Sequence, residues 1–158
     1  MHAVLLWLQA TSLATTIAES TWLFPIIETL HVIGLALVVG SIASFDLRVL
    51  GLGWRTRPLK TLAADILPWT WAGFALALTT GSLMFISAAA RYAANPAFLF
   101  KLGLMLLAGL NALVFHFHPH HRRFAAEVRA PAILRTSAAA SLFLWIGMVV
   151  FGRWIAFV

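Results

Sequence analysis

The sequence predicts an all-α, polytopic membrane protein: a four-helix transmembrane bundle with a short interfacial helix at its N-terminus. Two observations support this fold class. Of the 158 residues, 62% are hydrophobic and only 10% are charged, which is typical of membrane proteins rather than soluble domains. The hydrophobic residues also gather in four long runs, and a membrane span needs roughly 20 mostly apolar residues. Residues 1–158 are therefore expected to form a single transmembrane helical domain.

The four predicted spans cover about residues 22–48, 62–90, 96–117 and 131–156. Pro68 lies within the second span and is expected to kink it. Asn95 followed by Pro96 predicts an N-cap and a first-turn proline for the third span, and Pro131 is expected to open the fourth. Short polar segments with Gly, Pro and Asn separate the runs and supply the turns.

The N-terminal segment, residues 1–18, is apolar but is interrupted by Gln9 and by a Thr/Ser cluster. It also lacks the basic start of a signal peptide. A short helix that lies in the interface is favoured over a fifth span. Whether this segment spans the membrane or lies on it is left open at this point.

Basic residues predict the orientation of the chain. They gather in the loop after the first span and in the loop before the fourth: Arg48, Arg55, Arg57, Lys60, Arg122, Arg123, Arg129 and Arg135. Loops rich in Lys and Arg face the cytoplasm, so we expect a multi-pass protein of the bacterial inner membrane with both termini on the periplasmic side. Anionic lipid headgroups account for the net charge of +6, and nucleic acid is not an expected partner.

Small residues recur at four-residue intervals in the first two spans and predict which helix faces pack closely. They are Ala36, Gly40 and Ser44 in the first span, and Gly73, Ala77 and Gly81 in the second. These stripes suggest the inward faces but no function.

Polar residues inside the predicted spans are the strongest functional signal, because charged and imidazole side chains are costly in hydrocarbon. Glu28 and His31 lie one helical turn apart in the first span, and Lys101 lies at a similar depth in the third. The sequence predicts that these three residues share an outward-facing pocket, with Arg91 and Arg153 as further cations near the outer ends of their spans. The alternative is a buried Glu28–Lys101 ion pair with His31 hydrogen-bonded beside it.

Several cofactors are compatible with this pocket. Met84, Met105 and Met148 fall near the depth of His31 on the other three spans. Methionine in a membrane helix usually serves packing, but with His31 these thioethers could bind Cu(I), or one could be the second axial ligand of a haem iron. The cations suit the propionates of a haem. The chain contains no cysteine, which excludes disulfides, thiolate metal sites and Cys-attached haem.

The function favoured by these residues is a membrane-embedded haem b redox protein that passes electrons between an outward-facing donor and the quinone pool. A copper-binding transport or accessory protein with a periplasmic redox or copper partner is one alternative. A non-catalytic small subunit of a larger membrane complex is another. Ion conduction would need a polar chain through the inner halves of the spans, which are apolar until Asp46. Asp46, Arg48 and Asp65 are expected to form a charge network there.

The segments "LHVIGLALVVG", "DLRVLG" and "FLFKLGLMLLAGLN" resemble two families of small bacterial membrane proteins, the copper-resistance protein D domain and the HemJ-type protoporphyrinogen oxidases. The opening "ES-x-W-x-x-P-I-I-E-x-L-H", from Glu19 to His31, also resembles an uncharacterised family of four-helix bacterial proteins. Similarity to HemJ-type enzymes implies bound haem b and functional roles for His31 and Lys101. Arg48 would match the arginine that ends their first helix. Similarity to the copper-resistance domain implies copper movement instead. Whether the protein is an enzyme stays open.

Overall fold

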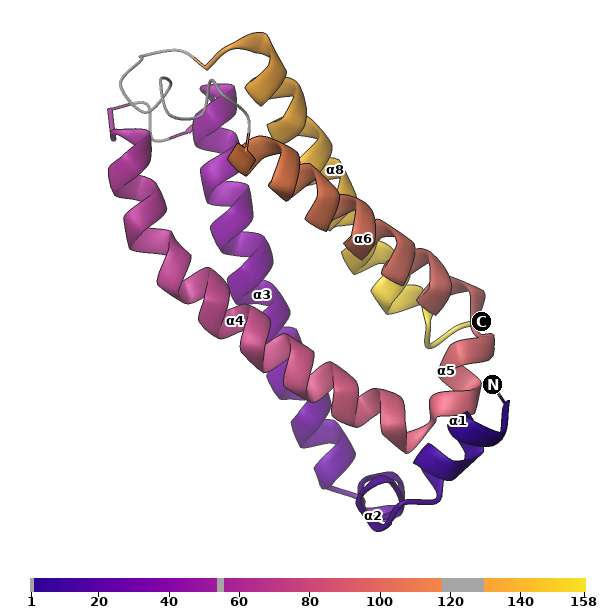
Figure 1. Cartoon of the computed structure of the whole chain (residues 1–158). Coiled ribbons are helices and arrows are strands. Elements are labelled where there is room, and N and C mark those ends of the chain that lie inside the picture. The colour runs from indigo at the N-terminus through magenta and orange to yellow at the C-terminus, as the bar shows by residue number, and fades with distance from the viewer. Residues whose placement is uncertain (1, 54–55, 118–129) are drawn as a thin grey trace.

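The computed structural model describes residues 2–53, 56–117 and 130–158, and in these residues the chain is almost entirely helical (Figure 1). Four helices are long and apolar enough to cross a membrane: α3 (Leu23–Leu50), α4 (Leu59–Ser87), α6 (Pro96–Phe117) and α8 (Ala132–Trp154). The all-α transmembrane fold is therefore confirmed, and each span lies within a few residues of its predicted bounds. α4 continues through Pro68 as one helix.

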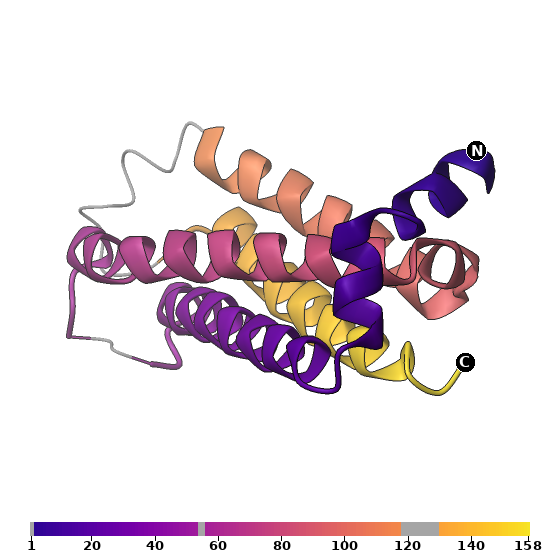
Figure 2. The same cartoon turned by 90° about the horizontal axis from the view of Figure 1, so that it is seen from below.

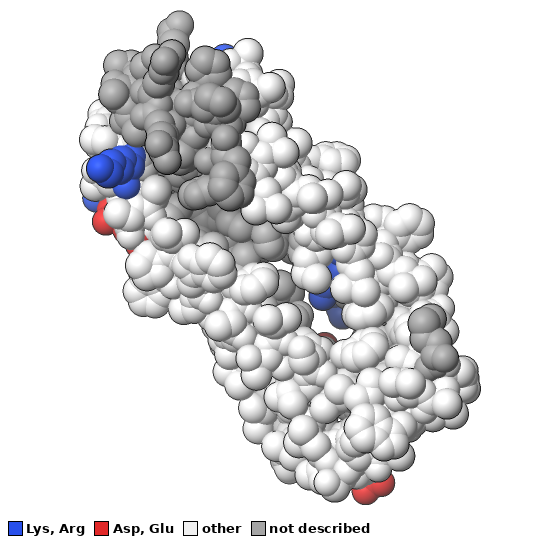
Figure 3. All heavy atoms as spheres, in the orientation of Figure 1, with Lys and Arg blue, Asp and Glu red and all other residues white. Residues whose placement is uncertain are grey.

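The spanning helices form two pairs. α3 packs along α4, α6 packs along α8, and contacts between α3 and α8 join the pairs. Figure 1 shows α4 and α6 separated over most of their length, and the space-filling view in Figure 3 shows a hollow on that side of the molecule. The bundle is therefore open along one side.

Close backbone contact holds α3 against α4. A Cβ atom added at Gly34 would lie 2.8 Å from the amide nitrogen of Ala77 and 3.0 Å from the carbonyl oxygen of Gly73. A Cβ at Gly73 would lie 2.7 Å from the Cβ of Leu37. Neither position has room for a side chain, so the two helices cross where their backbones nearly touch.

The small-residue stripe was predicted correctly for α4, where Gly73 and Ala77 are buried. It was wrong for α3, because Ala36 and Gly40 are exposed and nothing lies within 4 Å of a Cβ at Gly40. The α3 residue at the crossing is instead Gly34. Small residues are frequent on several faces of α3, so their spacing alone did not identify the face that meets α4.

Reciprocal hydrogen bonds connect α6 and α8. The side-chain amide of Asn111 donates to the carbonyl of Ser137 at 3.0 Å, and the hydroxyl of Ser137 donates to Oδ1 of Asn111 at 2.9 Å. The two residues supply each other's hydrogen-bond partners within the apolar interface. These bonds fix the relative height of the two helices.

The N-terminal segment folds into two short helices, α1 (His2–Gln9) and α2 (Ser12–Glu19). Each has eight residues and is too short to cross a membrane, so the expectation that this segment does not form a fifth span is confirmed. It forms two helices because the Thr11 side chain accepts a hydrogen bond from the amide of Ala14 and caps a new helix. Figure 2 shows α2 crossing α4 while α1 continues towards the next short helix, α5 (Ala89–Ala94).

Asn95 ties the start of α6 to the end of the chain. Its Oδ1 accepts a hydrogen bond from the amide of Phe98 at 3.1 Å, which confirms the predicted N-cap. Its side-chain amide donates to the carbonyls of Ile155 and Val158 at 3.1 and 2.7 Å. Both termini therefore lie at the same end of the bundle as α1, α2 and α5 (Figure 1), which we call the terminal end.

Charged residues gather at the opposite end, which we call the basic end. The Arg57 guanidinium forms a salt bridge with Asp65 at 3.1 Å, and Nε of Arg48 donates to the carbonyl of Arg57 at 2.9 Å. Asp46 does not take part, contrary to the predicted network. It is buried and lies close to Ser141 of α8. Arg55, Arg122, Arg123 and Arg129, which entered the predicted orientation, lie outside the described residues.

Replacing Gly34 with Ala is expected to lower the free energy of unfolding by about 1–3 kcal/mol, because the new methyl group forces α3 and α4 apart. The matched control is Gly40→Ala, which places the same group in open space and is expected to be neutral or slightly stabilising. Thermal unfolding in detergent compares the two variants. Equal stability would contradict the close crossing.

A double-mutant cycle on Asn111→Ala and Ser137→Ala is expected to show coupling between the two residues. Interhelical hydrogen bonds in membranes are typically worth about 0.6 kcal/mol, so the double variant should lose less stability than the sum of the single variants. Because Ser137→Ala keeps the backbone carbonyl, the cycle reports the bond from the Ser137 hydroxyl to Oδ1 of Asn111, and additive losses would show that this bond does not form. Equilibrium unfolding in mixed micelles supplies the free energies.

Candidate functional site

His31 lies on α3, half-buried against α4. Its Nδ1 is 2.9 Å from the carbonyl oxygen of Ala77 and 3.1 Å from Oγ1 of Thr80. The Thr80 hydroxyl donates its own proton to the carbonyl of Leu76 at 2.6 Å. Because a carbonyl can only accept, Nδ1 must be the protonated nitrogen that donates. In the neutral imidazole, Nε2 then carries the free lone pair.

The backbone of α4 also supports the imidazole ring. A Cβ atom at Gly81 would lie 3.0 Å from Cε1 of His31, so the ring occupies the space that a larger residue at position 81 would take. Hydrogen bonds on one nitrogen and this contact together fix the orientation of the ring. Such support is the usual environment of a histidine whose second nitrogen binds a metal.

Lys101 lies on α6 and is half-buried. It lines a small space of about 10 Å³ between α3 and α8, together with Leu35, Val39, Trp145, Met148 and Val149. A Cβ at Gly152 would lie 3.7 Å from its Nζ. The charge of Lys101 acts on His31, so the structure brings these two predicted site residues near each other.

Glu28 does not pair with Lys101. No carboxylate of the described residues lies within 4.0 Å of the Lys101 nitrogen, since the salt bridge found among them joins Arg57 to Asp65. The alternative of a buried Glu28–Lys101 ion pair is therefore wrong for this structure. Lys101 is left near His31 without a carboxylate partner.

Glu28 is exposed, and its charge acts on Tyr92 of α5. Burial raises the pKa of the Tyr92 phenol, although the neighbouring Arg91 opposes the shift. The Arg91 guanidinium lies 5.8 Å from the centre of the Tyr92 ring, and that of Arg153 lies 5.2 Å from the Phe157 ring. Both arginines are exposed at the terminal end, away from direct contact with His31.

The three candidate methionines occupy different surroundings. Met148 is 3% exposed and packs beside Lys101, whereas Met105 is 43% exposed on a separate face of α6. Met84 is half-buried near the end of α4. Within the described ranges, no group of three or more His, Cys, Asp or Glu residues is arranged to hold a metal ion.

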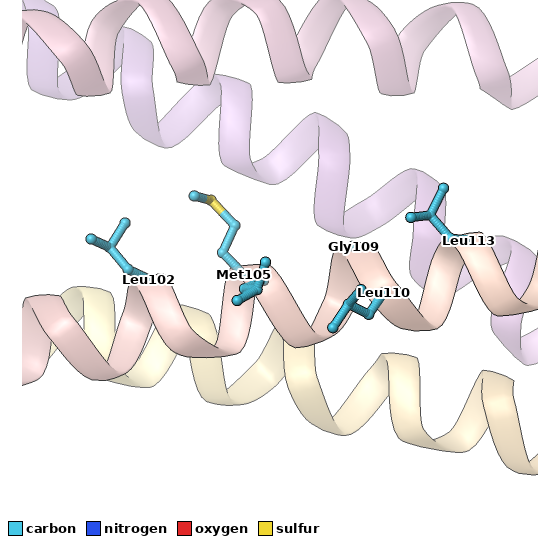
Figure 4. A pocket seen from close by; sticks show the side chains of 6 residues that line it. Leu102, Met105, Gly109, Leu110 and Leu113 are labelled. Atoms are coloured by element: carbon cyan, nitrogen blue, oxygen red, sulfur yellow. The ribbon is translucent and has the colours of Figure 1, made fainter.

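One face of α6 lines an open groove of about 650 Å³, formed by Leu102, Met105, Leu106, Gly109, Leu110 and Leu113. Figure 4 shows Met105 and Leu113 pointing from α6 towards α3 and α4. Figure 3 shows both basic and acidic side-chain atoms in the hollow between the two helix pairs. The groove volume lies within the range of small-molecule sites, about 300–1,000 Å³. Its lining is apolar, so it suits a hydrophobic molecule.

Sequence reasoning missed the α4 partners of His31. The carbonyl of Ala77 and the hydroxyl of Thr80 carry no pattern of their own in an apolar run, because which face of α4 meets α3 depends on the crossing at Gly34. The one usable signal was Gly81, which belongs to the small-residue stripe predicted for that helix.

Comparison with known proteins gives a family but no function. No curated protein and no solved structure matches the chain. A family model described as a family of unknown function, DUF6644, matches residues 11–158. The match includes all four spanning helices together with His31 and Lys101. The chain therefore belongs to the DUF6644 family.

Proposed function

We propose that this protein binds one haem b between its two helix pairs and passes electrons between a donor at the terminal end and quinone in the bilayer. The observation that carries the proposal is the hydrogen bond from Nδ1 of His31 to the Ala77 carbonyl. It fixes the imidazole and leaves Nε2 available as a ligand to iron. Histidine ligands of metal centres commonly donate their other N–H to a carbonyl in this way.

In addition to the fixed imidazole of His31, three features of α6 suit a haem. The open groove on α6 has room for a flat hydrophobic molecule and an apolar lining. Lys101 supplies a cation that has no carboxylate partner among the described residues, which suits an anionic propionate or a negatively charged reduced centre. Met105 faces the groove and is the methionine best placed to approach a molecule bound there.

Haem b bound in this position supplies one-electron redox chemistry. The protein's own residues orient it and set its electrostatic environment. His31 would hold the haem iron through Nε2, and Thr80 and Ala77 hold its ring in place. Lys101 stabilises added negative charge. The apolar face of α6 excludes water and remains accessible to a lipid-soluble partner such as quinone.

The resemblance to HemJ-type oxidases supports the same two residues, because it implies functional roles for His31 and Lys101 and the presence of haem b. The periplasmic location of the terminal end follows from the basic loops and belongs to this proposal. Copper binding has less support, since Met105 and Met148 line different spaces. The two methionines do not converge on His31 as a Cu(I) site would require.

Protein purified from a haem-sufficient host is expected to contain about one haem per chain and to show a sharp reduced α band. His31→Ala should lose the haem, because the axial ligand is removed. The control is His2→Ala, an exposed histidine in α1, which should retain it. Pyridine haemochrome quantification and circular dichroism measure haem content and folding. A haem-free wild-type protein refutes the proposal, and metal analysis of the same sample then tests for copper.

Replacing Lys101 with Met is expected to lower the midpoint potential of the bound haem. Loss of one nearby positive charge costs on the order of 1 kcal/mol, which corresponds to about 40 mV for one electron. Lys60→Met removes an exposed cation at the basic end and should leave the potential nearly unchanged. Spectroelectrochemical titration measures both variants. Equal potentials would show that Lys101 does not act on the haem.

A further inference from the structure

Asp46 is a buried acidic residue for which the proposed haem site has no use. It lies on α3 near the basic end and is 5% exposed. Its Oδ2 is buried and has no hydrogen-bond partner in the described part of the chain. Acidic residues inside membrane helices are costly and usually functional, so this orphaned oxygen requires an explanation.

The described cations at the basic end are engaged elsewhere or face solvent. Arg48, two residues further along α3, donates to the carbonyl of Arg57, and Arg57 forms its salt bridge with Asp65. Lys60 on α4 and Arg135 on α8 are exposed. No basic group of the described residues lies within 4.0 Å of the Asp46 carboxyl.

A buried apolar cluster lies one turn from Asp46 on α3. Val49, one turn further along α3, belongs to a buried cluster with Leu59 of α4 and with Leu134 and Ala138 of α8. The polar group that reaches the carboxyl is the hydroxyl of Ser141, one turn beyond Ala138 on α8. Asp46 therefore lies one turn from the point where α3, α4 and α8 meet, and Ser141 is the polar side chain that reaches it among the described residues.

A charged carboxylate in this position would be an uncompensated buried charge, which costs several kcal/mol. A metal cation would neutralise it but requires several oxygen ligands, and Ser141 offers one hydroxyl. A proton neutralises the carboxyl without additional ligands or space. The proton is therefore the ligand that these surroundings favour.

We propose that Asp46 is a proton-exchange site of the bundle. Oδ2 binds a proton from the aqueous phase at the basic end and releases it again, so that a carboxylate and a proton interconvert with the neutral acid. The Ser141 hydroxyl donates to the carboxylate form and stabilises it during exchange. Asp46 lies in the last turns of α3, which ends at Leu50, so the path to water is short.

A role for Asp46 in electron transfer rests on the proposed redox function. An electron that enters a low-dielectric bundle is stabilised when a positive charge follows it. The carboxylate form of Asp46 supplies that charge when it takes up a proton from the side opposite the terminal end. Protonation of the carboxyl itself does not depend on haem.

Infrared titration of the purified protein tests the proton site directly, with or without a cofactor. The wild type is expected to show the C=O stretch of a protonated carboxylic acid that disappears as the pH rises and shifts in deuterated water. Asp46→Asn should lose this band. The matched control is Asp65→Asn, which removes an exposed carboxylate at the same end and should keep it.

Ser141→Ala serves as a second variant if Asp46→Asn fails to fold. It retains the carboxyl but removes its polar neighbour, so the acid band should persist, change frequency and titrate at a different pH. Absence of the band from the wild type, or its survival in folded Asp46→Asn, would overturn the proposal. A titrating band in protein that lacks haem would support the proton site while refuting the proposed redox function.

Discussion

The crossing of α3 and α4 is the contact on which the candidate site depends. Gly34 and Gly73 allow the two backbones to meet, and the same approach brings the carbonyl of Ala77 within 2.9 Å of His31. A side chain at either glycine would separate the helices and remove the acceptor from the imidazole. The orientation of His31 is thus a consequence of backbone packing as much as of its own hydrogen bonds.

The open side of the bundle follows from how the two helix pairs are joined. α3 contacts both α4 and α8, whereas α6 contacts α8. Polar contacts stabilise the second pair internally: Asn111 and Ser137 bond across α6 and α8, and Asn95 holds the end of α8 to the start of α6. Among the described residues, no hydrogen bond or salt bridge draws α4 and α6 together across the groove.

The sequence predicted the helices well because spanning length and hydropathy are local properties. It also predicted a similar depth for His31 and Lys101, since depth can be counted along each helix. The rotation of each helix about its own axis decides which face meets a neighbouring helix, and it cannot be counted in the same way. The Gly34 face of α3 and the isolation of Asp46 depend on this rotation, and both differed from expectation. Rotation also decides against the alternative of a Glu28–Lys101 ion pair.

The fixed ring of His31 has a consequence for the thermodynamics of ligand binding. A free histidine side chain loses rotamer entropy when it takes hold of a ligand, and this loss weakens binding. In this protein the Ala77 carbonyl, Thr80 and Gly81 impose that order when the chain folds. A molecule that binds at Nε2 therefore meets a preorganised donor, and the stability of the α3–α4 crossing contributes to its affinity.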